Sequence, residues 1–159
     1  MRGAIKYIVV AAALPAALAA AERRSWDRIR YAGGTVALTT SRYDWNATLT
    51  VTANPNSITL TIAPEKLFAS KQTIRIDPAK VLSLSEGEEA WRRVAAVQGA
   101  QLPQRKQTLF GFLDPHRWAG IVYETSDGKQ GAVLLDSMQR WLFLRALSVL
   151  TGKEIEHSP

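Results

Sequence analysis

The chain has no cysteine and only two histidines among its 159 residues. Without cysteine, no disulfide can support the fold, so the hydrophobic core must be sufficient alone. His116 follows Asp114-Pro115, which together supply at most two metal ligands, and His157 stands in a polar tail. A metal site needs several ligands at defined spacing. We therefore interpret His116 as a turn residue and predict no metal site.

The sequence also lacks the motifs of common catalytic and nucleotide-binding sites. It contains no Gly-x-Ser-x-Gly nucleophile setting. Gly33-Gly34 has no lysine-serine pair that would make it a phosphate loop. Glu86, Glu88 and Glu89 could provide acid–base chemistry, but they stand where a helix is predicted to begin, and negative charge is favoured there. We predict no catalytic residue and no cofactor, and hence that the chain is not an enzyme.

The N-terminus has the pattern of a secretory signal peptide, predicted for residues 1–21. A basic segment, Met1 to Lys6, precedes an apolar core, Tyr7 to Leu18, and small residues at Ala19 to Ala21 suit a signal peptidase. The alternative is an uncleaved membrane anchor, although the apolar core is shorter than the roughly 20 residues that span a bilayer. We expect export to the periplasm or the medium, which makes nucleic acid a poor candidate partner.

Positive charge is concentrated just after this segment. Cleavage would leave 18 basic and 14 acidic residues, and residues 22–33 form a basic lead-in to the folded domain. Its arginines, Arg23, Arg24, Arg28 and Arg30, allow two interpretations. They are either a solvated surface or a site for an anionic lipid surface or an anionic polymer of the cell envelope.

Short stretches of β-type sequence follow the lead-in. Thr48 to Ala53 and Ser57 to Ile62 alternate strictly between apolar residues and polar ones, and Asn54-Pro55-Asn56 between them is typical of a turn. This is the clearest hairpin in the sequence. Further strands are predicted at 35–39, 72–76, 80–84, 121–125 and 131–135, and residues 108–113 are an additional candidate.

Two helices are expected. Ser85 to Glu88 has the form of a capping box for a short helix running to Gly99. Asp127-Gly128 predicts the turn of the last hairpin, and a long helix from Ser137 to Gly152 follows it. On a helical wheel, a broad apolar stripe of this long helix is predicted to face the core, comprising Met138, Leu142, Phe143, Ala146, Leu147, Val149 and Leu150.

Together these elements predict a mainly β protein of the α+β class. We expect about six or seven antiparallel strands in a partly open barrel, with the C-terminal helix covering its open end. The folded domain is predicted to span residues 34–153 and to be followed by a polar tail at 154–159.

Several short segments carry a resemblance to a known group of proteins. They are Pro78-Ala-Lys-Val-Leu-Ser-Leu84, Arg92-Arg93, Gly120-Ile-Val-Tyr-Glu124 with Asp127-Gly128-Lys129, and Leu150-Thr-Gly-Lys153. With them, residues 35–156 resemble small exported bacterial proteins of unknown function that are themselves similar to pleckstrin-homology-like and GRAM-like domains. The resemblance implies a pleckstrin-homology-like (PH-like) barrel and says nothing specific about function.

Two groups of side chains are candidates for contact with a partner. Trp141 and Leu144 fall on the helix arc that also holds Arg140 and Arg145, and apolar groups among arginines are typical of interfaces. The alternative is that Trp141 packs over the edge of the sheet. The same two interpretations apply to a second aromatic and basic cluster, formed by Trp26, Tyr31, Tyr43 and Trp45.

The sequence thus favours a non-enzymatic exported binding or scaffolding domain, whose partner is an unidentified protein or envelope component. The alternative is a peripheral binder of anionic membrane or envelope polymer through the basic N-terminal patch.

Overall fold

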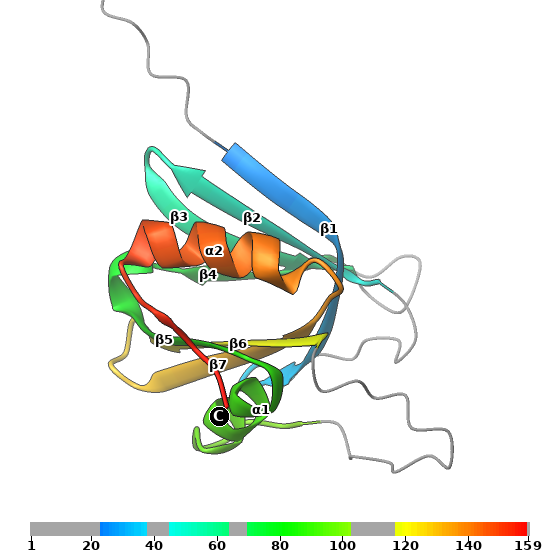
Figure 1. Cartoon of the computed structure of the whole chain (residues 1–159), viewed down its shortest axis with the longest axis vertical. Helices are drawn as coiled ribbons and strands as arrows, with labels where there is room; N and C mark the ends of the chain where they lie inside the picture. Colours follow the sequence, from blue (N-terminus) through cyan, green and yellow to red (C-terminus); the bar gives the residue numbers. More distant parts are fainter. Residues whose placement is uncertain (1–22, 38–44, 64–69, 103–116, 159) are drawn as a thin grey trace, which may run out of the picture.

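A computed structural model describes residues 23–37, 45–63, 70–102 and 117–158 of the chain (Figure 1). Eight strands form one sheet that does not close, in the order β4-β3-β2-β1-β7-β6-β5-β8. In chain order the elements are β1 (Arg23–Gly34), β2 (Ala47–Ala53), β3 (Asn56–Ile62), β4 (Gln72–Ile76), the 3-10 turn η1 (Pro78–Lys80), β5 (Val81–Glu86), α1 (Gly87–Ala95), β6 (Trp118–Glu124), β7 (Gln130–Asp136), α2 (Arg140–Thr151) and β8 (Ile155–Glu156). The expected α+β class, mainly β, is confirmed.

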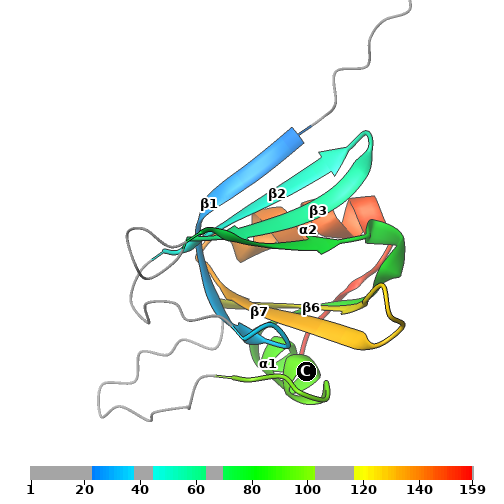
Figure 2. The same ribbon diagram turned by 180° about the vertical axis from the view of Figure 1, so that it is seen from behind.

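The longest strand, β1, joins the two halves of the sheet. Its first part pairs with β2, from Arg23 opposite Thr52 to Ile29 opposite Ala47. Its last part pairs with β7, from Arg30 opposite Asp136 to Gly34 opposite Val133. Figures 1 and 2 show β1 running along both halves, so that the sheet folds sharply around it. The interpretation of this segment as a lead-in outside the domain is therefore wrong.

The first half of the sheet, β1 to β4, agrees with the predicted alternation. Leu49 and Val51 of β2 and Ile58, Leu60 and Ile62 of β3 are buried, while the threonines between them are partly exposed on the opposite face. The turn at Asn54-Pro55 and the edge strand β4 lie where the sequence places them. Period-two alternation predicts this half well because one of its faces is core and the other faces water.

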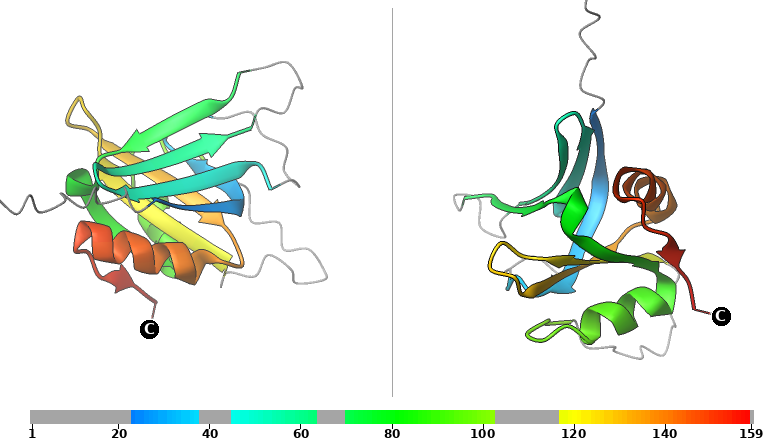
Figure 3. Two further views of the ribbon diagram at one scale, coloured as in Figure 1. Left: turned by 90° about the horizontal axis from the view of Figure 1, so that it is seen from above. Right: turned by 90° about the vertical axis from the view of Figure 1, so that its left-hand side faces the viewer.

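The second half, β5 to β7, is covered on both faces. Its inner residues, such as Ile121, Val133 and Leu135, belong to the main core with α2. Its outer residues, such as Val122 and Leu134, pack under α1 in a second cluster. Figure 3 shows α1 and α2 on opposite sides of these strands, which explains why β6 and β7 are almost continuously apolar.

The start of α1 differs from the expected capping box. Ser85 is buried within β5, and Glu86 occupies the N-cap position without a side-chain capping bond. Gly87 has φ 65°, and the chain turns there directly from strand to helix. The helix itself is confirmed.

The last hairpin and the end of α2 follow the sequence prediction closely. Thr125 and Lys129 close the turn with an N–H···O distance of 2.8 Å, and Gly128 has φ 79°. Gly152 ends α2 in the left-handed conformation, and its N–H donates to the carbonyl oxygen of Ser148 at 2.8 Å. Beyond it, Ile155 pairs in parallel with Leu84, so the predicted tail contains a short strand.

Some expectations fall partly or wholly outside the described residues. Residues 35–36 form a bend, not the start of the strand expected at 35–39, and Thr35 N–H donates to the Ala132 carbonyl at 2.9 Å. The strand expected at 108–113, His116 and the signal peptide predicted for residues 1–21 lie outside the described residues. Among the described residues, no helix is long and apolar enough to cross a membrane.

Candidate functional site

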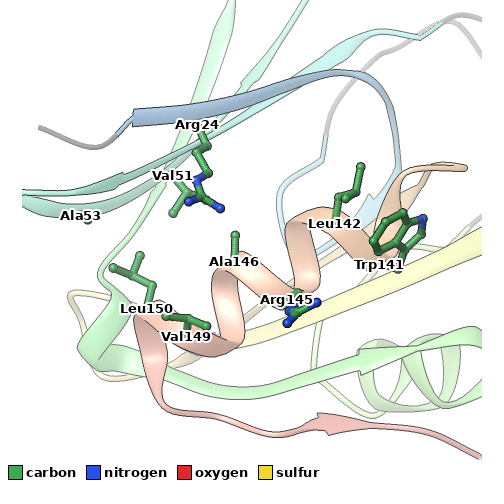
Figure 4. A pocket seen from close by; sticks show the side chains of 9 residues that line it. All are labelled: Arg24, Val51, Ala53, Trp141, Leu142, Arg145, Ala146, Val149 and Leu150. Atoms are coloured by element: carbon green, nitrogen blue, oxygen red, sulfur yellow. The ribbon is translucent and has the colours of Figure 1, made fainter.

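A groove lies between α2 and the strands β1 and β2, and we call it the α2 groove (Figure 4). Its volume is about 490 Å³, which lies within the usual range for ligand sites. Helix α2 forms one wall, and β1 and β2 form the other. The lining residues are Arg24, Val51, Ala53, Trp141, Leu142, Arg145, Ala146, Val149 and Leu150.

Strand pairing places Arg24 in this groove. Arg24 lies directly opposite Val51 in the β1–β2 ladder, so both side chains leave the same face of the sheet. That face turns toward the core and α2, as Leu49 and Trp26 next to them confirm by packing on the main cluster. Val51 is 6% exposed and forms part of the floor. A guanidinium group therefore stands beside an apolar floor.

The rotation of α2 about its own axis differs from the wheel prediction. Phe143, Leu144 and Leu147 are the fully buried residues of the helix. Leu144 is 0% exposed, so it belongs to the core and does not share an exposed strip with Trp141. Conversely, Val149 is 82% exposed, and Met138, Leu142 and Trp141 are also exposed. The predicted core stripe is thus wrong in part, and the interface interpretation is excluded for Leu144 and stays a prediction for Trp141.

The reason lies in the composition of α2. Only Arg140, Arg145, Ser148 and Thr151 of its 12 residues are polar, so its apolar arc is wider than one contact with a sheet can cover. A wheel gives the width of such an arc but not which part of it is buried. The excess of apolar residues is the sequence signal that could have indicated the exposed residues of the groove wall, Leu142 and Val149.

The arginines of the lead-in occupy three different environments. Arg24 lines the groove, whereas Arg23 and Arg28 are exposed elsewhere on β1. Arg30 forms an ion pair within the protein, since its Nη2 lies 2.8 Å from Oδ2 of the largely buried Asp136. The four arginines of the lead-in, predicted from the sequence as one basic patch, therefore do not form one surface.

The two arginines of α2 are also separated. Arg140 Nε lies 3.5 Å from Glu86 Oε2, and His157 Nδ1 lies 2.8 Å from the other oxygen of the same carboxylate. Arg140 therefore ties the start of α2 to the end of β5. Arg145 is exposed and lines the groove from α2, with its side chain at the edge of the helix away from Arg24 (Figure 4).

The predicted aromatic and basic cluster has mainly structural roles. Trp26 meets Phe143 edge to face, with ring centroids 6.1 Å apart. Tyr31 is buried and donates a hydrogen bond to the Val36 carbonyl, and burial raises the pKa of its hydroxyl far above the ordinary value. Trp45 is half exposed, and the guanidinium carbon of Arg117 lies 5.3 Å from its ring centre. Tyr43 lies outside the described residues.

Glu86 and Glu89, near the start of α1, are engaged in ion pairs rather than in a paired-carboxylate site. Glu89 is buried, and Arg93 Nε donates to its Oε1 at 2.8 Å while Arg92 Nε donates to its Oε2 at 2.9 Å. Burial alone would raise the pKa of Glu89, but these hydrogen bonds outweigh it and the pKa is lowered. Glu86 holds Arg140 and His157, as described above. The structural interpretation of the cluster therefore accounts for both residues.

The α2 groove combines an apolar lining with positive charge. Seven of its nine lining residues are apolar and the other two are arginines, which stay protonated and donate hydrogen bonds without accepting any. Such a site can desolvate an apolar group and hold an anion beside it. Within the described ranges, no cluster of three or more metal-ligating side chains occurs. Comparison with protein-family models, with curated proteins and with solved structures finds no match for this chain.

Proposed function

We propose that this chain is an exported, non-enzymatic binding or scaffolding domain whose ligand or partner occupies the α2 groove. The observation that carries the proposal is the pairing of exposed apolar residues with two arginines in one hollow of the surface. Large exposed apolar side chains in such a hollow are typical of binding sites. The basic and apolar N-terminal segments support export to the periplasm or the medium.

We further propose that the architecture is a PH-like, partly open barrel. Two features support this proposal. β1 is shared by both halves of the sheet, and α2 follows the last long strand and covers the space between the halves.

Site-specific photo-crosslinking tests whether the groove is a binding surface. Benzoylphenylalanine at position 149, which is 82% exposed, should form adducts with an envelope component when the full-length chain is made in its own cells. The same group at position 82, an exposed leucine of β5 outside the groove, is the matched control. Equal adduct yields at both positions, or none at 149, would argue against this function.

A second candidate function is peripheral binding to an anionic membrane or envelope polymer. It is supported by Arg23 and Arg28, both exposed on β1 and outside the groove. Exposed charges act over about 10 Å at 0.1 M salt, so this attraction should weaken steeply with ionic strength.

Co-sedimentation with vesicles of phosphatidylglycerol and phosphatidylcholine tests this second function. We expect binding at about 0.02 M salt that is lost at about 0.5 M salt, and lost at both in the double variant Arg23→Glu/Arg28→Glu. The matched control is Arg75→Glu, which reverses one exposed charge on the edge strand β4. Absence of binding at low salt would exclude this candidate.

A further inference from the structure

Resting on the proposed role of the α2 groove, we propose that its occupant is a short amphipathic helical segment of a partner protein with an acidic residue at its centre. The segment would present apolar side chains at positions i and i+7 and an aspartate or glutamate at i+3 or i+4. Four features of the groove support this pattern.

The apolar anchors of the groove lie at its two ends. Trp141 and Leu142 stand at one end, and Val149 and Leu150 stand at the other (Figure 4). Val149 comes eight positions after Trp141, which corresponds to about 12 Å along a helix. In a partner helix, positions i and i+7 are about 10.5 Å apart on one face. Two turns of an amphipathic helix therefore match the spacing of these ends.

Positive charge lies between these ends. Arg24 reaches from β1 toward α2, and Arg145 lies on α2 near the middle of the groove's length, with its side chain turned away from Arg24 (Figure 4). The walls as a whole are basic, because α2 has two arginines and no acidic residue, β1 has four arginines and one aspartate, and β2 is uncharged. A carboxylate held in this part of the groove can accept charge-assisted hydrogen bonds from the guanidinium groups that line it.

The strands beside the groove cannot accept another strand. β1 is paired with β2 and β7, and β2 is paired with β1 and β3, so their main-chain groups are used within the sheet. A segment bound here must therefore be recognised by its side chains, as when an amphipathic helix lies in a groove. This excludes strand addition as the mode of binding at this site.

The concave shape favours a peptide over a bilayer. Val51 on the floor is only 6% exposed, so a flat lipid surface would rest on Val149 and Trp141 without reaching it. Side chains projecting from a helix can enter the hollow and fill it. A peptide can therefore use both the apolar floor and the two arginines, whereas a membrane surface would leave the floor unused.

The test begins with selection from a display library of random 16-residue peptides on the immobilised full-length chain. Counter-selection on Val149→Asp removes peptides that bind elsewhere. We expect the selected peptides to share apolar residues seven apart and an acidic residue between them. Selected peptides without acidic enrichment, or failure to select any, would overturn the proposal.

Fluorescence anisotropy with the best selected peptide then tests the charge contact. Changing its central Glu to Gln, or changing Arg145→Glu or Arg24→Glu in the protein, should weaken binding at least about tenfold. A peptide with Lys in place of that Glu should regain binding to Arg145→Glu. Arg75→Glu serves as the control and should bind unchanged, since it lies on the opposite, polar face of the sheet. Equal losses in Arg145→Glu and Arg75→Glu would contradict the proposal.

Two further measurements identify other occupants. Vesicle binding that is lost in Val149→Asp would indicate a bilayer at the groove, and a dimer in sedimentation equilibrium that is lost in the same variant would indicate a second copy of the chain. Either result would overturn the peptide proposal. Crosslinking at position 149 without any selected peptide would reject the peptide while leaving the groove as a binding site. If position 149 forms no crosslink and no peptide is selected, the proposed function is rejected as well.

Discussion

Replacing Leu144 by alanine is expected to lower the free energy of unfolding by about 2–5 kcal/mol. Leu144 is 0% exposed and packs in the main core, so the change removes buried methyl groups and leaves a cavity. The matched control is Leu142→Ala, the same change two residues earlier on the exposed side of α2. It should lower the free energy of unfolding by about 1 kcal/mol or less.

Urea unfolding followed by circular dichroism measures both variants under the same conditions. Because the two positions share the helix and the substitution, intrinsic helix propensity cancels in the comparison. Equal losses of stability would show that α2 is not oriented as described. A larger loss of stability in Leu142→Ala than in Leu144→Ala would support the core-facing stripe that the helical wheel predicts.

Replacing Gly34 by alanine should lower the free energy of unfolding by at least about 3 kcal/mol. Its φ is 150°, and an added Cβ would lie 2.1 Å from the Ala132 carbonyl oxygen and 2.8 Å from the Tyr31 hydroxyl. Relief of this contact requires β1 to move away from β7. Gly34 also exchanges main-chain hydrogen bonds with Gln101, at 3.0 and 2.8 Å, which the movement would strain.

The control for Gly34 is Gly128→Ala in the β6–β7 turn. Gly128 also has a positive φ, 79°, but its added Cβ would have no neighbour within 4 Å. Only the conformational preference of alanine opposes this change, which corresponds to about 1–2 kcal/mol. Thermal unfolding of both variants separates the steric effect from the backbone effect. Similar midpoints would mean that β1 and β7 do not approach as closely as described.

Local patterns predicted the half-exposed strands and the C-terminal end of α2 because those features depend on near neighbours, whereas α2 begins at Arg140 and not at Ser137. The alternation of β2 and β3 reflects one wet face and one dry face. Gly152 stops α2 through its own backbone conformation. In each case, the physical cause lies within a few residues of the position predicted.

β1 was missed because its pattern is interrupted. Trp26, Ile29 and Tyr31 all pack inward, but a register shift between Trp26 and Ile29 breaks the period of two. Four arginines in the same strand, two before Trp26 and two after it, make the segment resemble a solvated leader. A bulge places consecutive inward residues at irregular spacing, and no local count of alternation detects it.

The candidate site could be predicted only in pieces. The sequence singled out Arg24 and Arg145 in two separate groups, one near each end of the chain. Their meeting depends on the β1–β2 register and on the rotation of α2, both of which are set by long-range packing. The same cause separates Trp141 from Leu144, which are neighbours on a wheel but lie on different sides of the helix contact.

The position of β1 also determines the order in which this protein can fold. Its first residues find partners in β2, fewer than 30 positions later, whereas Arg30 must wait for Asp136, 106 positions away. Closing so long a loop is entropically unfavourable and slows folding. During synthesis, the second part of β1 therefore remains an unpaired strand edge until the C-terminal hairpin emerges, and in that interval the chain is most exposed to aggregation.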